Sequence, residues 1–162
     1  MPRSDSEARI TLSVLDRLID SDPGSPADPP PTRTRSLREL KRNVRRDLEW
    51  LLNTRREIHD LSTDLQQAAK SLLMYGLPDF SAASVSNPSD QKYMLRTLEL
   101  AIELFEPRLG RVAIRLEPGG ETERSLHFRI EAELLVDPAP EPVTFDTTVQ
   151  LYSGEYDVKE EE

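Results

Sequence analysis

The sequence predicts an α+β fold in which N-terminal helices are followed by a small antiparallel three-stranded sheet that a helix covers. Apolar residues recur at spacings of three and four up to Phe105, as on one face of an amphipathic helix. From Val112 onward they recur at every second position, as in strands with one buried face. The chain has 162 residues, of which 36% are apolar, and this suffices for one modest core.

The first 35 residues divide into a short helical segment and a linker. Within residues 1–20 a helical apolar pattern spans about ten positions, which is marginal for an isolated helix in water. Residues 21–35 form a proline-rich linker, because they hold few apolar groups and their prolines favour extended backbone. The short helix either docks on its own domain or binds a partner, and we favour the partner.

A basic helix begins after the linker, at a capping box that starts with Ser36. Residues 33–56 carry nine Arg or Lys against three acidic residues, which is more than local ion pairs require. Arg38, Arg42 and Arg45 fall near one face, and guanidinium groups pair with carboxylates in a bidentate geometry. The pattern therefore predicts a surface for an acidic protein partner. The alternatives are an ordinary solvated surface and a nucleic-acid interface, for which the interleaved aromatic residues are missing.

Two further helices precede the strands. The first is expected at about residues 62–74 and ends before Gly76. The second is expected at residues 89–105, where apolar residues keep the helical spacing through more than three turns. Pro107 ends this helix, because a proline disfavours helical backbone in the residue before it. This second helix is the expected cover of the sheet.

The predicted strands each have one apolar and one charged face. The first two carry Val112, Ile114 and Leu116, then Leu126, Phe128, Ile130, Ala132 and Leu134. The third carries Val143, Phe145, Thr147, Val149 and Leu151. Because a three-stranded sheet has two open edges, the third strand is a candidate surface for addition of a partner strand. The folded domain is expected to span residues 36–152, and residues 153–162 are expected to form a solvated acidic tail.

The chain offers few groups for catalysis or metal binding. Cysteine is absent, and neither His59 nor His127 has a second histidine at ligand spacing, so we predict no metal and no cofactor. Glu99, Glu103 and Glu106 are the nearest match to the paired carboxylates of a peptidoglycan hydrolase. Their helical spacing favours a solvated helix face instead. A net charge of -9 argues against bulk nucleic-acid binding, and no apolar run reaches the roughly 18 residues of a membrane span. We therefore predict a soluble, cytoplasmic protein without enzymatic activity.

The triplet Glu106-Pro107-Arg108 lies between the last helix and the first strand. Proline fixes its own φ and restricts the residue before it, so the two opposite charges project from a stiff corner. Such a corner can hold a neighbouring element through charge-assisted hydrogen bonds. A simple helix stop with two solvent-facing charges explains the residues equally well.

Four short motifs occur along the chain in a specific order. They are Leu15-Asp-Arg-Leu18, Asp47-Leu-Glu-Trp-Leu-Leu-Asn-Thr-Arg-Arg56, Ser71-Leu-Leu-Met-Tyr-Gly-Leu-Pro-Asp-Phe80 and Phe105-Glu-Pro-Arg-Leu109. In this order the chain resembles the TssE family of type VI secretion baseplate subunits, which belongs with the sheath-initiator wedge proteins of contractile phage baseplates. The resemblance covers about residues 11–152. Met74, where the family has Asn, and a longer proline-rich linker depart from its pattern.

The resemblance implies a structural role without a cofactor. It implies that Glu106, Pro107 and Arg108 contact the core bundle of the wedge, which TssF and TssG contribute, and that TssK is reached through the wedge. It also implies that strands from the first ring of the sheath proteins TssB and TssC extend the small sheet. Such a protein belongs to the baseplate at the cytoplasmic face of the inner membrane. Some members carry a lysozyme-like label, for which this sequence offers no catalytic constellation.

Overall fold

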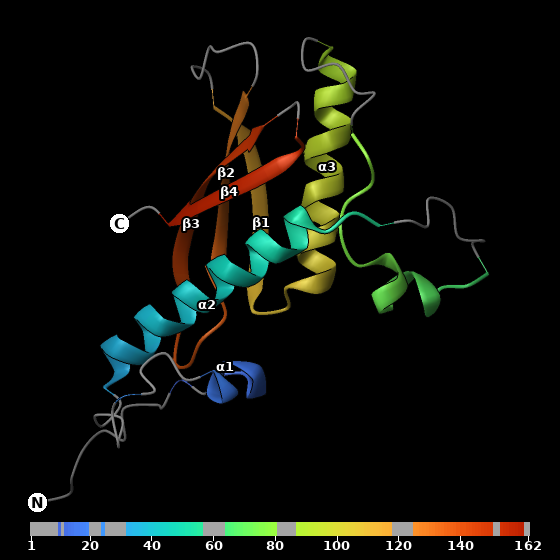
Figure 1. Cartoon of the computed structure of the whole chain (residues 1–162). Helices are drawn as coiled ribbons and strands as arrows, with labels where there is room; N and C mark the ends of the chain where they lie inside the picture. The colour runs from blue at the N-terminus through green and yellow to red at the C-terminus, as the bar shows by residue number, and fades with distance from the viewer. Residues whose placement is uncertain are drawn as a thin grey trace, which may run out of the picture.

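Two helices and one sheet form the body of the protein (Figure 1). The structure is a computed structural model that describes residues 10, 12–19, 24, 32–56, 64–80, 87–117, 125–150 and 153–160. The long helices are α2 (Arg33–Asn53) and α3 (Pro88–Phe105), and the shorter elements are α1 (Val14–Leu18), η1 (Ala68–Lys70) and η2 (Leu72–Met74). The sheet is antiparallel throughout, with neighbouring strands in the order β1-β2-β3-β4.

The sheet has four strands, so the prediction of three strands was wrong, although the α+β class holds. The strands are β1 (Leu109–Leu116), β2 (Ser125–Leu134), β3 (Glu141–Gln150) and β4 (Glu155–Glu160). The fourth strand lies where the sequence suggested a solvated tail. Only Tyr156 and Val158 are apolar within β4, and two apolar residues among charged ones are too few to reveal a period of two. Both are buried, with 5% and 0% of their surface exposed.

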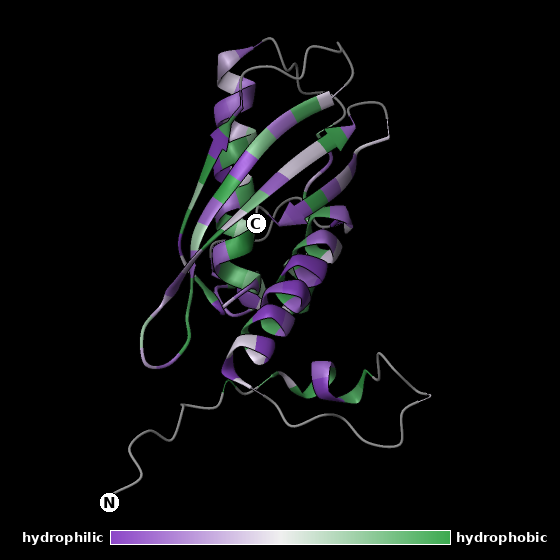
Figure 2. Cartoon of the chain, turned by 90° about the vertical axis from the view of Figure 1, so that its left-hand side faces the viewer, coloured by the Kyte–Doolittle hydropathy of each residue, from purple (hydrophilic) through white to green (hydrophobic). Residues whose placement is uncertain are grey.

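The core lies between one face of the sheet and the two long helices. Every second side chain of β2 and β3 is buried, and α2 packs against β4 while α3 packs against β1. Figure 2 shows this alternation of hydrophobic and hydrophilic residues along the strands. Leu48 of α2, Ile102 of α3 and Phe145 of β3 are among the fully buried side chains. Burial of each such side chain stabilises the fold by about 1.5–3 kcal/mol.

The helices start and end somewhat differently from the prediction. α2 begins at Arg33 with Thr32 as its cap, three positions before the expected start, so the first residues of α2 lie in the segment predicted as a linker. The helix expected at residues 62–74 is replaced by η1 and η2 in the described part of that segment. Ser71 separates them, because its side chain donates to the carbonyl of Ala68 and accepts from the amide of Leu73.

Candidate partner-binding site at the Glu106-Pro107-Arg108 corner

The triplet forms the junction between α3 and β1. α3 ends at Phe105, as predicted from Pro107, and Glu106 leaves the helical region with φ -121° and ψ 74°. The amide of Leu109 donates to the carbonyl of Glu106 at 3.1 Å, which closes a tight turn into β1. The junction therefore holds the two charged side chains on a short, constrained backbone.

Glu106 and Arg108 pair with each other instead of facing solvent. Arg108 donates from Nε to Oε1 of Glu106 at 2.6 Å and from Nη2 to Oε2 at 2.5 Å. Such bidentate pairs are among the stronger hydrogen-bonded ion pairs in proteins. Only 4% of the Glu106 surface is exposed, so its interpretation as part of a solvated helix face was wrong.

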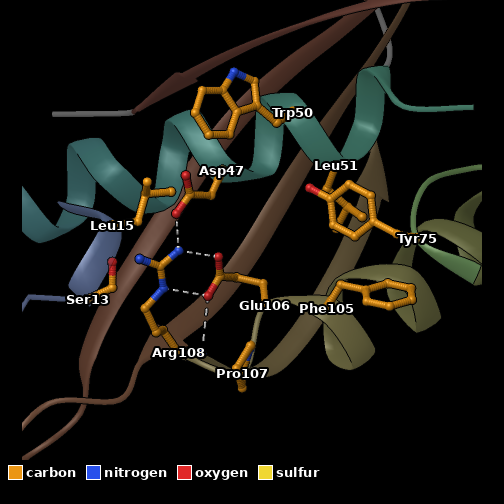
Figure 3. A pocket seen from close by; sticks show the side chains of 10 residues that line it. All are labelled: Ser13, Leu15, Asp47, Trp50, Leu51, Tyr75, Phe105, Glu106, Pro107 and Arg108. Carbon is orange, nitrogen blue, oxygen red and sulfur yellow. Dashed lines mark hydrogen bonds and ion pairs between the residues drawn. The ribbon is translucent and has the colours of Figure 1, made fainter. Parts of the chain in front are cut away.

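The pair is the centre of a larger charge network, made of Asp16, Arg46, Asp47, Glu106 and Arg108. Arg108 Nη2 also donates to Asp47 Oδ2 at 2.5 Å, as Figure 3 shows. Arg46 Nη2 donates to Asp47 Oδ1 at 2.7 Å and to Asp16 Oδ1 at 2.8 Å. The Nη1 group of Arg108 lies 3.5 Å from Asp16 Oδ2. The network therefore joins α1, α2 and the corner before β1.

The pKa of Arg108 is raised by this network. Desolvation by burial alone would lower it, but the hydrogen bonds and charges of Glu106 and Asp47 outweigh that effect. The guanidinium group is thus held in its charged form by two carboxylates from different elements. This arrangement fixes the orientation of Arg108 at the surface of the protein.

α1 is docked through an acidic residue and not through its apolar ones. Asp16 is buried, and it accepts a hydrogen bond from the backbone amide of its own cap, Ser13, in a capping box. The apolar residues Leu15 and Leu18 remain 50% and 76% exposed. The sequence left open whether this segment docks on its own domain or binds a partner. In the structure α1 lies against its own domain, and much of its apolar surface is exposed to solvent. Charge pairing, together with the packing of Ile10 and Leu12 against the core, therefore holds a helix too short to be stable alone.

Asp16→Asn is expected to weaken the docking of α1. Burial raises the pKa of Asp16, but the hydrogen bonds from Ser13 and Arg46 and the charges of Arg46 and Arg108 outweigh it, so the pKa is lowered from the usual value of an aspartate. A lowered pKa means that Asp16 stabilises the fold above its unfolded-state pKa of about 3.9 and loses this effect as the pH falls through the folded-state value. We expect Asp16→Asn to lower the free energy of unfolding by about 1–3 kcal/mol at pH 7 in urea titrations.

The loss should shrink as the pH falls from about 4 through the lowered folded-state pKa, because the wild-type carboxyl then takes up a proton as well. Arg17→Ala is the matched control, because Arg17 lies in the same helix and is exposed. It should change the free energy of unfolding by less than about 0.5 kcal/mol. A difference between wild type and Asp16→Asn that stays constant from pH 7 to pH 2 would contradict the role of the Asp16 charge.

A hollow of about 460 Å³ opens beside the charge network. It is lined by Ser13, Leu15, Asp47, Trp50, Leu51, Tyr75, Phe105, Glu106, Pro107 and Arg108. Figure 3 shows the guanidinium of Arg108 directed at the carboxylates of both Asp47 and Glu106, with Trp50 beyond Asp47 and with Tyr75 and Phe105 beyond Glu106. The rings of Tyr75 and Phe105 meet edge to face at 5.3 Å, and Trp50 is half exposed. The hollow thus combines apolar walls with a charged floor.

The basic helix contributes to the fold as well as to the surface. Arg45 donates to the carbonyl of Val158 in β4 at 3.0 Å, and Arg46 belongs to the charge network. Of the three arginines predicted to bind a partner, Arg38 and Arg42 are exposed, whereas Arg45 is half-buried at the sheet edge. The guanidinium carbon of Arg46 lies 4.9 Å from the centre of the Trp50 ring, so this exposed ring makes a cation–π contact with Arg46.

The sheet edges are not where the sequence suggested. β3 pairs with β2 along its whole length and with β4 from Phe145 onward, so Phe145, Thr147 and Val149 of the predicted edge are interior. Among the described residues, Val143 is paired with Ala132 of β2 alone. Leu151 lies outside the described residues. The outer edge of β4 is closed by α2, because Asn53 both donates to and accepts from the backbone of Tyr156 at 2.9 Å. On β1, Glu99 accepts from the amide of Ile114 at 3.3 Å.

Other candidate chemistry does not assemble among the described residues. His127 lies on the outer face of the sheet within hydrogen-bond distance of Ser125 and Thr148. In the part of the chain that the structure covers, no three His, Asp or Glu side chains gather as metal ligands. His59 lies outside the described residues. Among the described helices, none combines the length and apolar character of a membrane span.

Sequence reasoning found the triplet but missed three members of the charge network as site residues: Asp16, Arg46 and Asp47. Asp16 interrupts a short apolar pattern, and an acidic residue among apolar neighbours is the feature that could have drawn attention to it. Arg46 and Asp47 are adjacent in a helix rich in charges, so nothing in the sequence separates them from solvated residues. The contact between Asp16 of α1 and Arg108 of the corner spans 92 positions and requires the fold.

The fold and the site define a small α+β protein whose distinctive feature is a charged corner beside an apolar hollow. The family described as baseplate wedge protein gp25 matches residues 38–139, a range that includes most of α2, all of α3, the triplet, β1 and β2. The chain belongs to this family, which confirms the resemblance drawn from the motifs. It is therefore a baseplate wedge component of the contractile phage type, a structural class of protein. No curated protein sequence matches the chain.

Proposed function

We propose that this chain is the sheath-initiating baseplate subunit of a type VI secretion system. It would join the wedge core bundle of TssF and TssG to the first ring of the TssB and TssC sheath, with TssK reached through the wedge. Its place would be the baseplate at the cytoplasmic face of the inner membrane. The observation that carries the proposal is the Glu106-Arg108 pair, which is anchored from α2 and α1 and stands beside an open hollow.

The pair supports wedge binding because its geometry is already formed in the isolated chain. A preorganised charged corner loses little conformational freedom when a partner binds. Exposed arginines on α2, at Arg38 and Arg42, add a second surface that an acidic partner can contact. No feature of the described residues favours the hydrolase alternative or the nucleic-acid alternative over this role.

Arg108→Lys tests the wedge contact while keeping the charge. Lysine retains the positive charge but cannot make the bidentate contact to Glu106, so the corner should lose its fixed geometry. We expect copurification with the TssF–TssG complex to fall about tenfold, which corresponds to about 1.4 kcal/mol. Arg111→Lys is the control, because Arg111 is exposed and its ion pair, among the described residues, is with Glu133 of the neighbouring strand. Equal copurification of both variants with the wedge proteins would contradict the role of Arg108.

For the sheath contact we propose the outer edge of β1. The β4 edge is closed by side chains of α2 at Tyr156 and Val158. On the outer side of β1, the amide of Ile114 makes, among the described residues, only the long hydrogen bond to Glu99. An exposed strand edge offers unpaired amide and carbonyl groups to an incoming strand. The β1 edge is therefore the better candidate for strand addition.

Leu116→Pro tests this edge. The amide of Glu117 donates inward to β2, so the amide of Leu116 points outward, and proline would remove an outer donor without breaking the ladder. We expect recruitment of purified TssB–TssC to the chain to fall at least about threefold, while wedge copurification stays unchanged. Leu116→Ala is the matched control, since it also shortens the side chain but keeps the amide. Equal sheath recruitment by the two variants would argue against strand addition at β1.

A further inference from the structure

The hollow beside the triplet has a chemical character that the wedge role alone does not explain. Its floor is formed by Asp47, Glu106 and Arg108, and most of its walls are apolar or aromatic. Trp50, which lines the hollow, is half exposed. Its volume of about 460 Å³ leaves room for a side chain of a partner. Its charges decide which kind of side chain fits.

The hollow carries an excess of negative charge. The charge network contains three carboxylates and two guanidinium groups, which leaves one negative charge unbalanced. Tyr75, which lines the hollow, is subject to the same negative potential. Its pKa is raised, first by burial and then by the charges of Asp47 and Glu106. A cationic group would therefore be attracted into the hollow, and an anionic group would be repelled.

The carboxylates on the floor also have room for further hydrogen bonds. A carboxylate oxygen can accept about two hydrogen bonds. Among the described residues, Asp47 Oδ2 and Glu106 Oε2 each accept one, and in both cases the donor is Arg108 Nη2. Asp47 Oδ2 and Glu106 Oε2 can therefore each accept one further hydrogen bond, and both oxygens lie next to Arg108 Nη2. A planar group with several N–H donors matches this arrangement.

The walls suit the remainder of such a side chain. Trp50, Tyr75 and Phe105 offer aromatic surface, on which a guanidinium group stacks better than an ammonium group does. Leu15 of α1 lines the same hollow, and Leu18 lies exposed on the same short helix. Apolar residues that flank the cationic side chain on the partner could rest on this helix.

We propose that the hollow binds an arginine side chain of a partner protein, flanked by apolar residues that pack on α1. The inference deepens the proposed function, on which it rests for the identity of the partner as a wedge protein. It gives α1 a role, because Asp16 holds Leu15 at the rim of the hollow. It also explains why Trp50 is exposed next to a charge network instead of being buried in the core.

The test uses the full ¹⁵N-labelled chain and two blocked tripeptides, leucine-arginine-leucine and leucine-citrulline-leucine. Citrulline has nearly the shape of arginine without its charge, so the difference in affinity between the two peptides measures the contribution of the positive charge to binding. We expect the arginine peptide to shift the indole N–H resonance of Trp50 in a saturable manner at low salt. The citrulline peptide should bind about tenfold more weakly, as expected for the loss of a charge-assisted contact. The backbone amide of Tyr93, an exposed aromatic residue of α3, serves as the internal control.

Equal shifts with both peptides, or no shift with the arginine peptide, would overturn the inference. In the Asp47→Asn variant, the affinities for the arginine and citrulline peptides should differ less than in the wild type. If this variant does not fold, the comparison of the two peptides on the wild-type chain decides alone. The titration contains no wedge protein, so its result is separate from that of copurification. A chain that copurifies with TssF–TssG but ignores the arginine peptide refutes only the arginine site. A chain that binds the peptide but not the wedge refutes only the proposed function.

Discussion

Arg108→Met is expected to lower the free energy of unfolding by about 3 kcal/mol, although Arg108 is a partly exposed residue at the surface. The reason is that the substitution removes a cation from two carboxylates, those of Glu106 and Asp16. The Glu106 side chain is only 5% exposed and that of Asp16 is fully buried, and both would lose a cation. A buried carboxylate without a cationic partner destabilises the folded state, because it has lost its hydration and no ion pair or hydrogen bond compensates for that loss. Urea denaturation followed by circular dichroism measures the change.

The matched control is Arg115→Met. Arg115 also pairs with a glutamate, Glu131 at 3.4 Å, but the two side chains are 70% and 41% exposed. Exposed pairs of this kind contribute between zero and about 1 kcal/mol. A double variant that adds Glu106→Gln to Arg108→Met should be more stable than the sum of the two single effects predicts, because it removes the stranded charge. If Arg108→Met and Arg115→Met cost the same, the charge network has no structural role.

This expectation differs from the one that the sequence suggests. The sequence alone presents Glu106-Pro107-Arg108 as a helix stop with charges that could be exposed or functional, and it predicts an effect on partner binding only. The structure gives the same residues a structural role as well, because Asp47 of α2 and Asp16 of α1 converge on Arg108. Stability and binding must therefore be measured separately for every variant of this corner.

The parts of the fold that the sequence could predict are those with a long, regular apolar pattern. α3 and the strands β1, β2 and β3 are in this group, since each repeats its period several times. β4 could not be recognised, because it has two apolar residues and charged neighbours. The segment at η1 and η2 has helical spacing, but hydrogen bonds of the Ser71 side chain compete with a continuous helix.

The candidate site shows the same limit. The corner itself is a local feature, so the proline and the two charges at residues 106–108 marked it in the sequence. The other members come from α1 and α2, and ion pairs between distant segments leave no periodic pattern. The choice of sheet edge failed for a related reason. An extra strand, β4, pairs with the predicted edge strand β3, and the outer side of β4 is covered by α2, so β1 keeps the open edge of the sheet.

The fourth strand leads to the prediction with the largest effect on stability. Val158→Asp is expected to lower the free energy of unfolding by at least about 4 kcal/mol. Val158 is fully buried between the sheet and α2, so the variant would place a carboxylate in the core without a partner. Domains of this size are stable by only about 5–15 kcal/mol, so a large unfolded fraction should appear at low urea concentrations.

Asp157→Ala is the control for this prediction, because Asp157 is the neighbouring residue of β4 and points to the exposed side. It should change the free energy of unfolding by less than about 0.5 kcal/mol. The contrast between adjacent positions is specific to a strand, in which successive side chains point to opposite faces. In a solvated tail both variants would leave the urea transition unchanged. Similar transitions for Val158→Asp and Asp157→Ala would therefore favour the acidic tail that the sequence suggests, and different ones require the strand.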